Sequence, residues 1–235
     1  MIDQVQAFEA LKTFDWGGDV AALKPIDEAV IATRDKPDAR AELEKQLIAA
    51  LEGDLKRASK DFVCRILTVI GTAASVPALN KLLAQPDDAQ LARFALERIP
   101  AAEARQALLA ALSTSTGPQL IGVIGSLGAR GESESVDALS GLLNNSEETV
   151  GRAAARSLGA IRNAEAAKAL DNANAENDVV KMAIIDARLS CAEAFLAAGK
   201  NGDALAIYKS LVGDDQPKHV KLGATRGMLA CAGKK

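Results

Sequence analysis

The chain has 235 residues, of which 49% are hydrophobic, 25% charged and only 3% aromatic. This balance excludes a disordered polymer and provides enough apolar surface for a sizeable core. Twenty-eight basic and thirty-one acidic side chains give a net charge of −3 without any long block of like charge, so no polyanion-binding patch is present in the sequence.

Alanine and leucine dominate, while aromatic and β-branched residues are sparse, and this mixture favours helix over strand. The first residues lack a basic segment followed by a long apolar run, and no run of about eighteen apolar residues occurs anywhere. The sequence therefore predicts an all-α protein without a signal peptide or membrane span. Its location stays open between the cytoplasm and an exported or periplasmic site whose signal has been removed.

In chain order, residues 1–18 predict a short amphipathic helix that ends near Trp16-Gly17-Gly18 and caps the N-terminus. A less regular helix pair follows at 23–34 and 39–51. From Ser59 the pattern becomes regular, with a first helix that ends at Gly71 and a second helix that Ser75 caps. Ser146 is a similar predicted N-cap further along the chain.

Apolar helices end at a small or breaking residue at nearly constant intervals. The predicted stops are Ile70-Gly71, Ile99-Pro100, Leu127-Gly128, Leu158-Gly159 and Ala198-Gly199, and the first four are 29, 28 and 31 residues apart. The second helices, aligned on Leu79, Leu108, Leu139 and Leu170, repeat every 29, 31 and 31 residues. A period of about thirty residues is typical of helix pairs that must stack on their neighbours to bury their apolar faces, which is an α-solenoid.

The stretch 150–159, with the sequence VGRAAARSLG, resembles the first helix of short bacterial HEAT-like repeats of the phycobilisome-lyase type. The resemblance covers residues 55–174, and 1–54 and 179–233 are similar to further parts of such proteins. Residues 197–208 also look like a tetratricopeptide helix turn. The resemblance implies one right-handed α-solenoid domain over 1–235, an α-α superhelix of HEAT-like helix pairs. Within it, 1–54 is the N-terminal cap and irregular pair, 55–174 the regular repeats, and 175–235 a set of HEAT- or TPR-like repeats expected to be truncated.

No residue set in the sequence points to catalysis, a metal or a cofactor. His219 is the only histidine and follows a helix-opening proline, so we expect it on the surface. Cys64, Cys191 and Cys231 lie far apart inside apolar patterns and are expected to be core thiols. The glycine run 122, 125, 128 and 131 lacks the preceding strand of a phosphate loop, and we expect it to serve close helix packing and a turn.

Four arginines recur six or seven residues before a helix stop: Arg65, Arg93, Arg152 and Arg226. The HEAT resemblance implies an internal ladder, in which each arginine bonds to a carbonyl or an acid of the neighbouring repeat. Binding of an anionic partner is the alternative role for these side chains.

The resemblance also implies that second helices line the concave side of the array. The expected binding residues there are Asn80, Lys81, Gln106, Asp137, Lys168 and Asp171. Their mixed charge favours a protein or peptide partner, without nucleic acid or membrane insertion. We therefore expect a non-enzymatic binding scaffold. An accessory or regulatory module of a larger bacterial protein is the alternative, and a HEAT-like enzyme of the lyase or DNA glycosylase type is the third.

The last predicted helix, 217–231, has apolar residues on more than one face, among them Val220, Leu222 and Leu229. A terminal repeat normally has a polar outer face. The sequence therefore predicts that the chain is a fragment of a longer array or that it self-associates through this helix.

Overall fold

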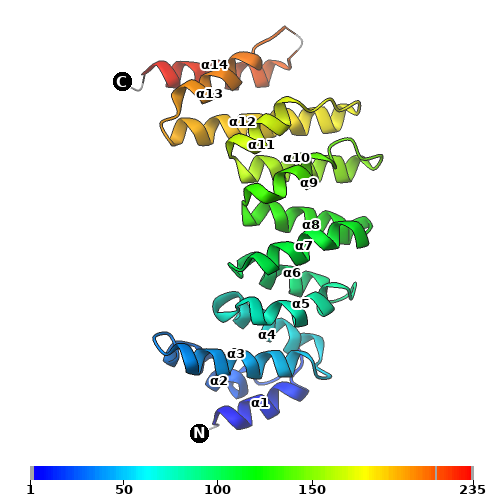
Figure 1. Cartoon of the computed structure of the whole chain (residues 1–235), viewed down its shortest axis with the longest axis vertical. Coiled ribbons are helices and arrows are strands. Elements are labelled where there is room, and N and C mark those ends of the chain that lie inside the picture. The colour runs from blue at the N-terminus through cyan, green and yellow to red at the C-terminus, as the bar shows by residue number, and fades with distance from the viewer. Residues whose placement is uncertain (1–2, 215, 234–235) are drawn as a thin grey trace. The chain divides into compact units, whose positions relative to one another are not determined.

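The computed structural model describes residues 3–214 and 216–233, and helices with short turns account for its regular structure (Figure 1). No strand occurs in these ranges. The chain divides into two compact units, residues 1–126 (unit 1) and 127–235 (unit 2), with the division inside helix α8. Each unit is a stack of helix pairs, so the predicted all-α solenoid architecture is confirmed. The single continuous domain stays a prediction.

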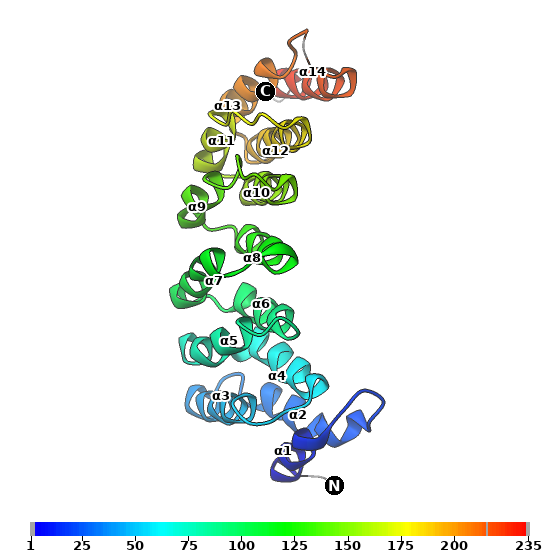
Figure 2. The same cartoon turned by 90° about the vertical axis from the view of Figure 1, so that its right-hand side faces the viewer.

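Unit 1 begins with an irregular set of helices and continues with regular pairs. Its helices are α1 (Gln4–Thr13), η1 (Val20–Leu23), α2 (Lys24–Ala32), α3 (Pro37–Leu51), α4 (Arg57–Ile70), η2 (Ala73–Ser75), α5 (Val76–Leu83), α6 (Ala89–Arg98), α7 (Ala102–Thr114) and most of α8 (Gly117–Arg130). Within the regular part α5 and α7 form one layer, and α4 and α6 form the other (Figure 2).

Unit 2 begins with the end of α8 and repeats the same two-layer arrangement. Its helices are η3 (Ser133–Ser135), α9 (Val136–Ser140), α10 (Glu148–Ile161), α11 (Ala164–Asp171), α12 (Asp178–Ala197), α13 (Asn201–Ser210) and α14 (Lys218–Gly233). The first helices α10 and α12 pack directly on each other, and the second helices α9 and α11 form the opposite layer (Figure 2). No helix among the described residues has both the length and the apolar character needed to cross a membrane.

Three predicted helix stops are confirmed, and two are wrong. Helices α4, α6 and α12 end within two residues of the predicted positions, but α8 continues through Gly128 to Arg130 and α10 through Gly159 to Ile161. A Cβ at position 128 would come within 2.7 Å of Ser157 Cβ, and one at position 159 within 2.8 Å of Ala187 Cα. These glycines therefore allow neighbouring first helices to approach each other closely instead of ending a helix.

Of the two predicted serine caps, Ser75 is confirmed in position and Ser146 is wrong. Ser75 is the N-cap residue of α5, but its hydroxyl donates to the buried Glu44 carboxylate at 2.6 Å instead of accepting from an amide of the helix. Ser146 lies one residue too early, because the N-cap of α10 is Glu147, whose amide donates to Asn145 Oδ1 at 2.9 Å. In both places a side-chain partner outside the helix competes with the local cap.

The core of each unit consists mainly of aliphatic side chains from both layers, and polar bonds between elements add specific contacts. In unit 1 these bonds run from Ser59 Oγ to Leu11 O, from Thr72 N to Glu44 Oε1 and from Gln119 Nε2 to Leu83 O; in unit 2 they run from Asn163 Nδ2 to Ser133 Oγ, from Asn177 Nδ2 to Glu148 Oε2 and from Asn201 Nδ2 to Cys231 O. The bonds of Asn163 and Asn177 join equivalent positions of successive pairs, and the other four join different elements. The stacking register is therefore set by specific partners as well as by apolar burial.

The remaining expectations about single residues are largely confirmed. Cys64, Cys191 and Cys231 are free and buried. Gly131 forms a turn with φ +72°, and Gly122 and Gly128 lie at close helix contacts, as predicted for the glycine run. In α14 Val220 is buried, whereas Leu222 and Leu229 are 53% and 69% exposed, which confirms that this helix has apolar residues on more than one face.

Candidate binding site

The second-helix layer of unit 2 holds a hollow between α9 and α11. Asn163 sets the position of both walls, because its Oδ1 accepts from Ala166 N at 2.7 Å and caps α11, while its Nδ2 donates to Ser133 Oγ at 2.7 Å just before α9. The apolar sides of the two helices, including Leu139 and Leu170, point into the core. Their polar sides are thereby left facing the hollow.

This second-helix hollow has a volume of about 570 Å³. Its lining residues are Val136, Asp137, Ser140, Leu143, Asn144, Glu165, Lys168, Ala169, Asn172, Ala173 and Asn174. Most of them have polar side chains, and none is aromatic. Such a lining is suited to hydrogen bonding with a polar chain rather than to enclosing a flat apolar ligand.

The polar groups around the hollow have little internal pairing. Within the described residues, Asp137, Glu165 and Lys168 form no side-chain ion pair, although both signs of charge are present. The exposed side-chain amides of Asn172 and Asn174 likewise have no hydrogen-bond partner in the described part of the chain. These groups are available to a ligand at no cost in lost internal bonds.

Asn144 completes a pattern that the sequence analysis missed. Asn144 follows the second helix of its repeat, as Asn172 and Asn174 follow theirs, and its side chain is exposed and unpaired within the described ranges. The recurrence of asparagine 28 and 30 residues later was visible in the sequence. It was overlooked because asparagine after a helix is also a common turn residue.

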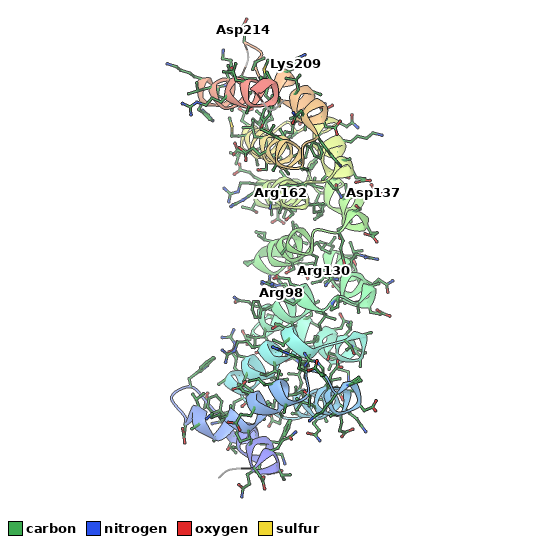
Figure 3. All side chains as sticks on the ribbon, turned by 90° about the vertical axis from the view of Figure 1, so that its left-hand side faces the viewer. Arg98, Arg130, Asp137, Arg162, Lys209 and Asp214 are labelled. Carbon is green, nitrogen blue, oxygen red and sulfur yellow. The ribbon has the colours of Figure 1, made fainter. Side chains whose placement is uncertain are left out.

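The structure brings together two of the six predicted binding residues. Asp137 and Lys168 both line the second-helix hollow, and Figure 3 shows Asp137 on the α9 side of unit 2. Asp171 lies outside this lining, and its carboxylate accepts a hydrogen bond from Arg188.

The other three predicted residues belong to unit 1. Lys81 forms an ion pair with Glu52 at 2.6 Å, both side chains being largely exposed. Asn80 on α5 and Gln106 on α7 are exposed. The role of all six side chains in binding stays a prediction.

Of the four arginines in the predicted ladder, only Arg93 bonds to the neighbouring repeat within the described ranges, and its partner is a hydroxyl instead of the predicted carbonyl or acid. Arg93 Nη1 donates to Ser126 Oγ of α8 at 3.3 Å, whereas Arg65 pairs with Asp61 of its own helix at 3.2 Å. Arg152 and Arg226 are exposed and have no side-chain partner among the described residues. Burial lowers the pKa of Arg93, and the nearby Glu97 carboxylate opposes that shift.

Two further arginines tie repeats together and were not predicted. Arg40 Nη2 donates to Val69 O at 3.0 Å, and Arg188 Nη2 donates to Asp171 and, at 2.8 Å, to Ser210 Oγ. Neither lies at the fixed interval before a helix stop, so the spacing of the arginines does not predict them.

Groups with shifted pKa values do not assemble a reaction centre in the described structure. Burial raises the pKa of Cys64 to about 12 and that of Cys191 to about 11, so both thiols stay protonated and weakly nucleophilic at neutral pH. His219 is exposed in the first turn of α14. No cluster of three potential metal ligands occurs among the residues described.

The fold defines the class of this chain: an all-α helical-repeat protein built from stacked helix pairs. More particularly, residues 106–187 match the family model of HEAT repeats, and this segment includes both walls of the second-helix hollow. The predicted HEAT resemblance is confirmed for that segment.

Comparison with whole proteins adds little to this assignment. An engineered protein whose crystal structure was determined by the Northeast Structural Genomics Consortium is 18% identical, with a TM-score of 0.40, over 88% of this chain and 96% of its own. No curated protein matches the sequence.

Proposed function

We propose that the chain is a non-enzymatic scaffold that binds an extended peptide segment of a partner protein in the second-helix hollow. The observation that carries this proposal is the set of three unpaired, exposed asparagine side chains around one hollow: Asn144, Asn172 and Asn174. A side-chain amide offers a donor and an acceptor, as a peptide group does, so each one is able to bond to the backbone of an extended segment whatever its sequence.

Charges around the hollow supply the selectivity. Asp137 and Glu165 outnumber the cation Lys168, so basic side chains of the bound segment are favoured near α9. The volume of about 570 Å³ is within the range of sites that enclose a few residues of a ligand. Exposed asparagine and lysine side chains act here through hydrogen bonds and charge, and the binding requires no chemical step.

The same proposal includes a family relationship finer than the match to HEAT repeats. We take the chain to be a bacterial HEAT-like repeat protein of the phycobilisome-lyase type, with a tetratricopeptide-like turn between α12 and α13. The support is the sequence resemblance of 150–159 and 197–208 together with the tight connection from Ala197 to Asn201.

Selection from a phage-displayed library of random peptides tests the proposal, with the full chain as bait. We expect selected peptides whose affinity falls at least about tenfold when Asn144, Asn172 and Asn174 are all changed to alanine, because each lost hydrogen bond weakens the complex. Fluorescence anisotropy with labelled copies of the selected peptides measures this change.

A matched control removes polar side chains elsewhere. The double variant Gln85→Ala/Gln90→Ala alters two exposed amides of unit 1 to which no binding role is assigned. Unchanged affinity in this variant is expected if the site is confined to unit 2. Equal affinity of the parent and the triple asparagine variant for every selected peptide would overturn the proposal.

A further inference from the structure

A second hollow lies on the opposite layer of unit 2, between the first helices α10 and α12. This first-helix groove has a volume of about 740 Å³. Its lining residues are Arg152, Arg156, Gly159, Ala160, Arg162, Asp178, Val179, Met182, Ala183, Asp186, Ala187 and Ser190. The floor closes where Gly159 packs against Ala187, and Figure 3 shows Arg162 on this side of the unit.

An equivalent helix pair elsewhere in the chain provides an internal comparison for this groove. Burial aligns the successive first helices on pairs of fully or largely buried residues, which are Ala95-Leu96 in α6, Val123-Ile124 in α8, Ala154-Ala155 in α10 and Ala183-Ile184 in α12. In this alignment the α6–α8 pair corresponds to the α10–α12 pair.

The basic side of the groove differs between the two pairs at one charged position. Two residues before the aligned pair both helices have an arginine, Arg93 in α6 and Arg152 in α10. Directly after the pair, α6 has Glu97 and α10 has Arg156. In α6 the arginine thus has an acid one helical turn away, whereas in α10 it has a second arginine there. Two like charges at this spacing repel each other.

The facing helix differs as well. Arg93 lies over Gly122 and donates to Ser126 Oγ, whose own hydrogen bond goes to Glu97 Oε1 at 2.7 Å. These side chains join α6 to α8 through one contact and two hydrogen bonds.

In the α10–α12 pair, Met182 and Asp186 occupy the positions of Gly122 and Ser126. Because even a Cβ at position 122 would collide with the Arg93 guanidinium, a methionine at the equivalent position excludes an arginine from lying over α12 in the same way. Arg152 and Arg156 therefore remain exposed, without an ion pair or side-chain hydrogen bond in the described structure. The groove is open for the same reason.

Charge in the groove favours an anion. Arg152, Arg156 and Arg162 contribute three positive charges, and among the described residues the Arg162 side chain bonds only to the carbonyl of Ala160. Of the two carboxylates, Asp178 is already paired with Lys181 at 2.9 Å. This leaves Asp186 as the single acid facing the arginines.

We propose that the first-helix groove binds an acidic segment of a partner protein. A carboxylate of that segment lies between Arg152 and Arg156 and supplies the negative charge that Glu97 supplies beside Arg93. Arginine is suited to bind a carboxylate through paired hydrogen bonds. An apolar side chain of the segment packs on Met182 and on Val179, which is 41% exposed. The site is separate from the second-helix hollow and does not depend on its function.

Random-peptide selection on the full chain also tests this proposal. We expect a class of peptides with at least two acidic residues beside an apolar one, whose affinity falls at least about tenfold in the variant Arg156→Glu. That change gives α10 the arginine–glutamate spacing of α6. Arg152 then has an acid on its own helix and no longer needs an anion from a partner. The variant Arg226→Glu changes the same charge at an exposed position of α14 and is expected to bind normally.

The variant Met182→Gly/Asp186→Ser separates groove shape from net charge. The variant gives α12 the two residues that α8 has in the α6–α8 pair. Arg152 is therefore expected to fold into the groove, and peptide binding is expected to weaken at least about tenfold. Loss of an acid alone would strengthen binding of an anionic peptide. Circular dichroism confirms that each variant keeps its helices.

Three results would overturn the proposal. They are the absence of an acidic class among the selected peptides, equal binding of that class to the parent and to Arg156→Glu, and tighter binding of the Met182→Gly/Asp186→Ser variant. A mixed-sequence DNA oligonucleotide is measured alongside, and a preference for it over every peptide would assign the arginines to phosphate instead. Peptides sensitive to the three asparagines but not to Arg156 report on the second-helix hollow alone, so the two proposals fail independently.

Discussion

The guanidinium of Arg93 lies directly over Gly122, so that any side chain larger than hydrogen at position 122 would collide with it. Arg93 Nη1 also donates to Ser126 Oγ one turn further along α8. A glycine and an arginine on adjacent first helices thus form one packing unit. Where the glycine is replaced by Met182 in the equivalent pair, the arginine is displaced and a groove remains.

Close helix contact at Gly128 predicts a large effect of a small substitution. In the variant Gly128→Ala the new methyl group would meet the Cα and Cβ of Ser157 at 2.8 and 2.7 Å, and we expect about 1–3 kcal/mol lower stability from overpacking. Gly125→Ala on the same helix is the control, because nothing lies within 4 Å of its Cβ and alanine favours the helix by about 0.5–1 kcal/mol. Urea unfolding measures both, and a loss at Gly125 equal to that at Gly128 would contradict the packing argument.

The buried carboxylate of Glu44 is predicted to be essential for the stability of unit 1. It accepts from Thr72 N at 2.7 Å and from Ser75 Oγ at 2.6 Å, and only 4% of the residue is exposed. Glu44→Ala leaves these donors without a partner, which is expected to lower the free energy of unfolding by about 2–4 kcal/mol. Glu42→Ala, at an exposed position of the same helix, should change it by less than about 0.5 kcal/mol. Similar effects of the two variants in thermal unfolding would rule out this role.

Asn163 is predicted to hold the two walls of the second-helix hollow in register. Asn163→Asp keeps the acceptor that caps α11 but loses the donor to Ser133, so we expect about 0.5–1.5 kcal/mol lower stability and weaker binding of selected peptides. Asn163→Ala loses the cap as well, at a further cost of about 1 kcal/mol. Chemical unfolding and anisotropy measure both effects, and unaltered peptide affinity in Asn163→Asp would show that this bond does not position the walls.

Burial of the thiols predicts a loss of stability at high pH. The pKa of Cys64 is raised from 9.0 to about 12 and that of Cys191 from 9.0 to about 11, chiefly by desolvation. Between pH 9 and 11 the unfolded chain therefore releases thiol protons that the folded chain retains, and stability falls as pH rises, by up to about 1.4 kcal/mol per pH unit for each thiol. Unfolding titrations of the parent and of Cys64→Ala/Cys191→Ala measure this slope. An equal slope in both proteins would contradict the prediction.

Periodic apolar spacing was sufficient to predict the fold class and most helices, because stacked pairs repeat the same burial requirement in every repeat. The spacing gave wrong predictions where a contact between repeats, and not the local sequence pattern, determines the structure. Gly128 and Gly159 have the residue type of a helix stop, yet close approach to Ser157 and Ala187 keeps them inside helices. Ser75 has the residue type of a cap, yet its hydroxyl bonds to Glu44 from another repeat.

The candidate site was only partly predictable for a similar reason. Asp137 and Lys168 were found because their place on a second helix follows from periodicity. Asn172 and Asn174 lie in or just after a helix end, where the helical period no longer predicts which way a side chain points. The pairing of Asp171 with Arg188 depends on the packing of α11 against α12, which no single helix pattern contains.

Hydrogen–deuterium exchange of the full chain, with and without a selected asparagine-sensitive peptide, is the most direct test of the proposed binding function. The account predicts slower exchange in 136–144 and 164–174, the two walls of the second-helix hollow, with the first-helix groove and unit 1 unchanged. Protection that falls only outside these two walls would contradict it.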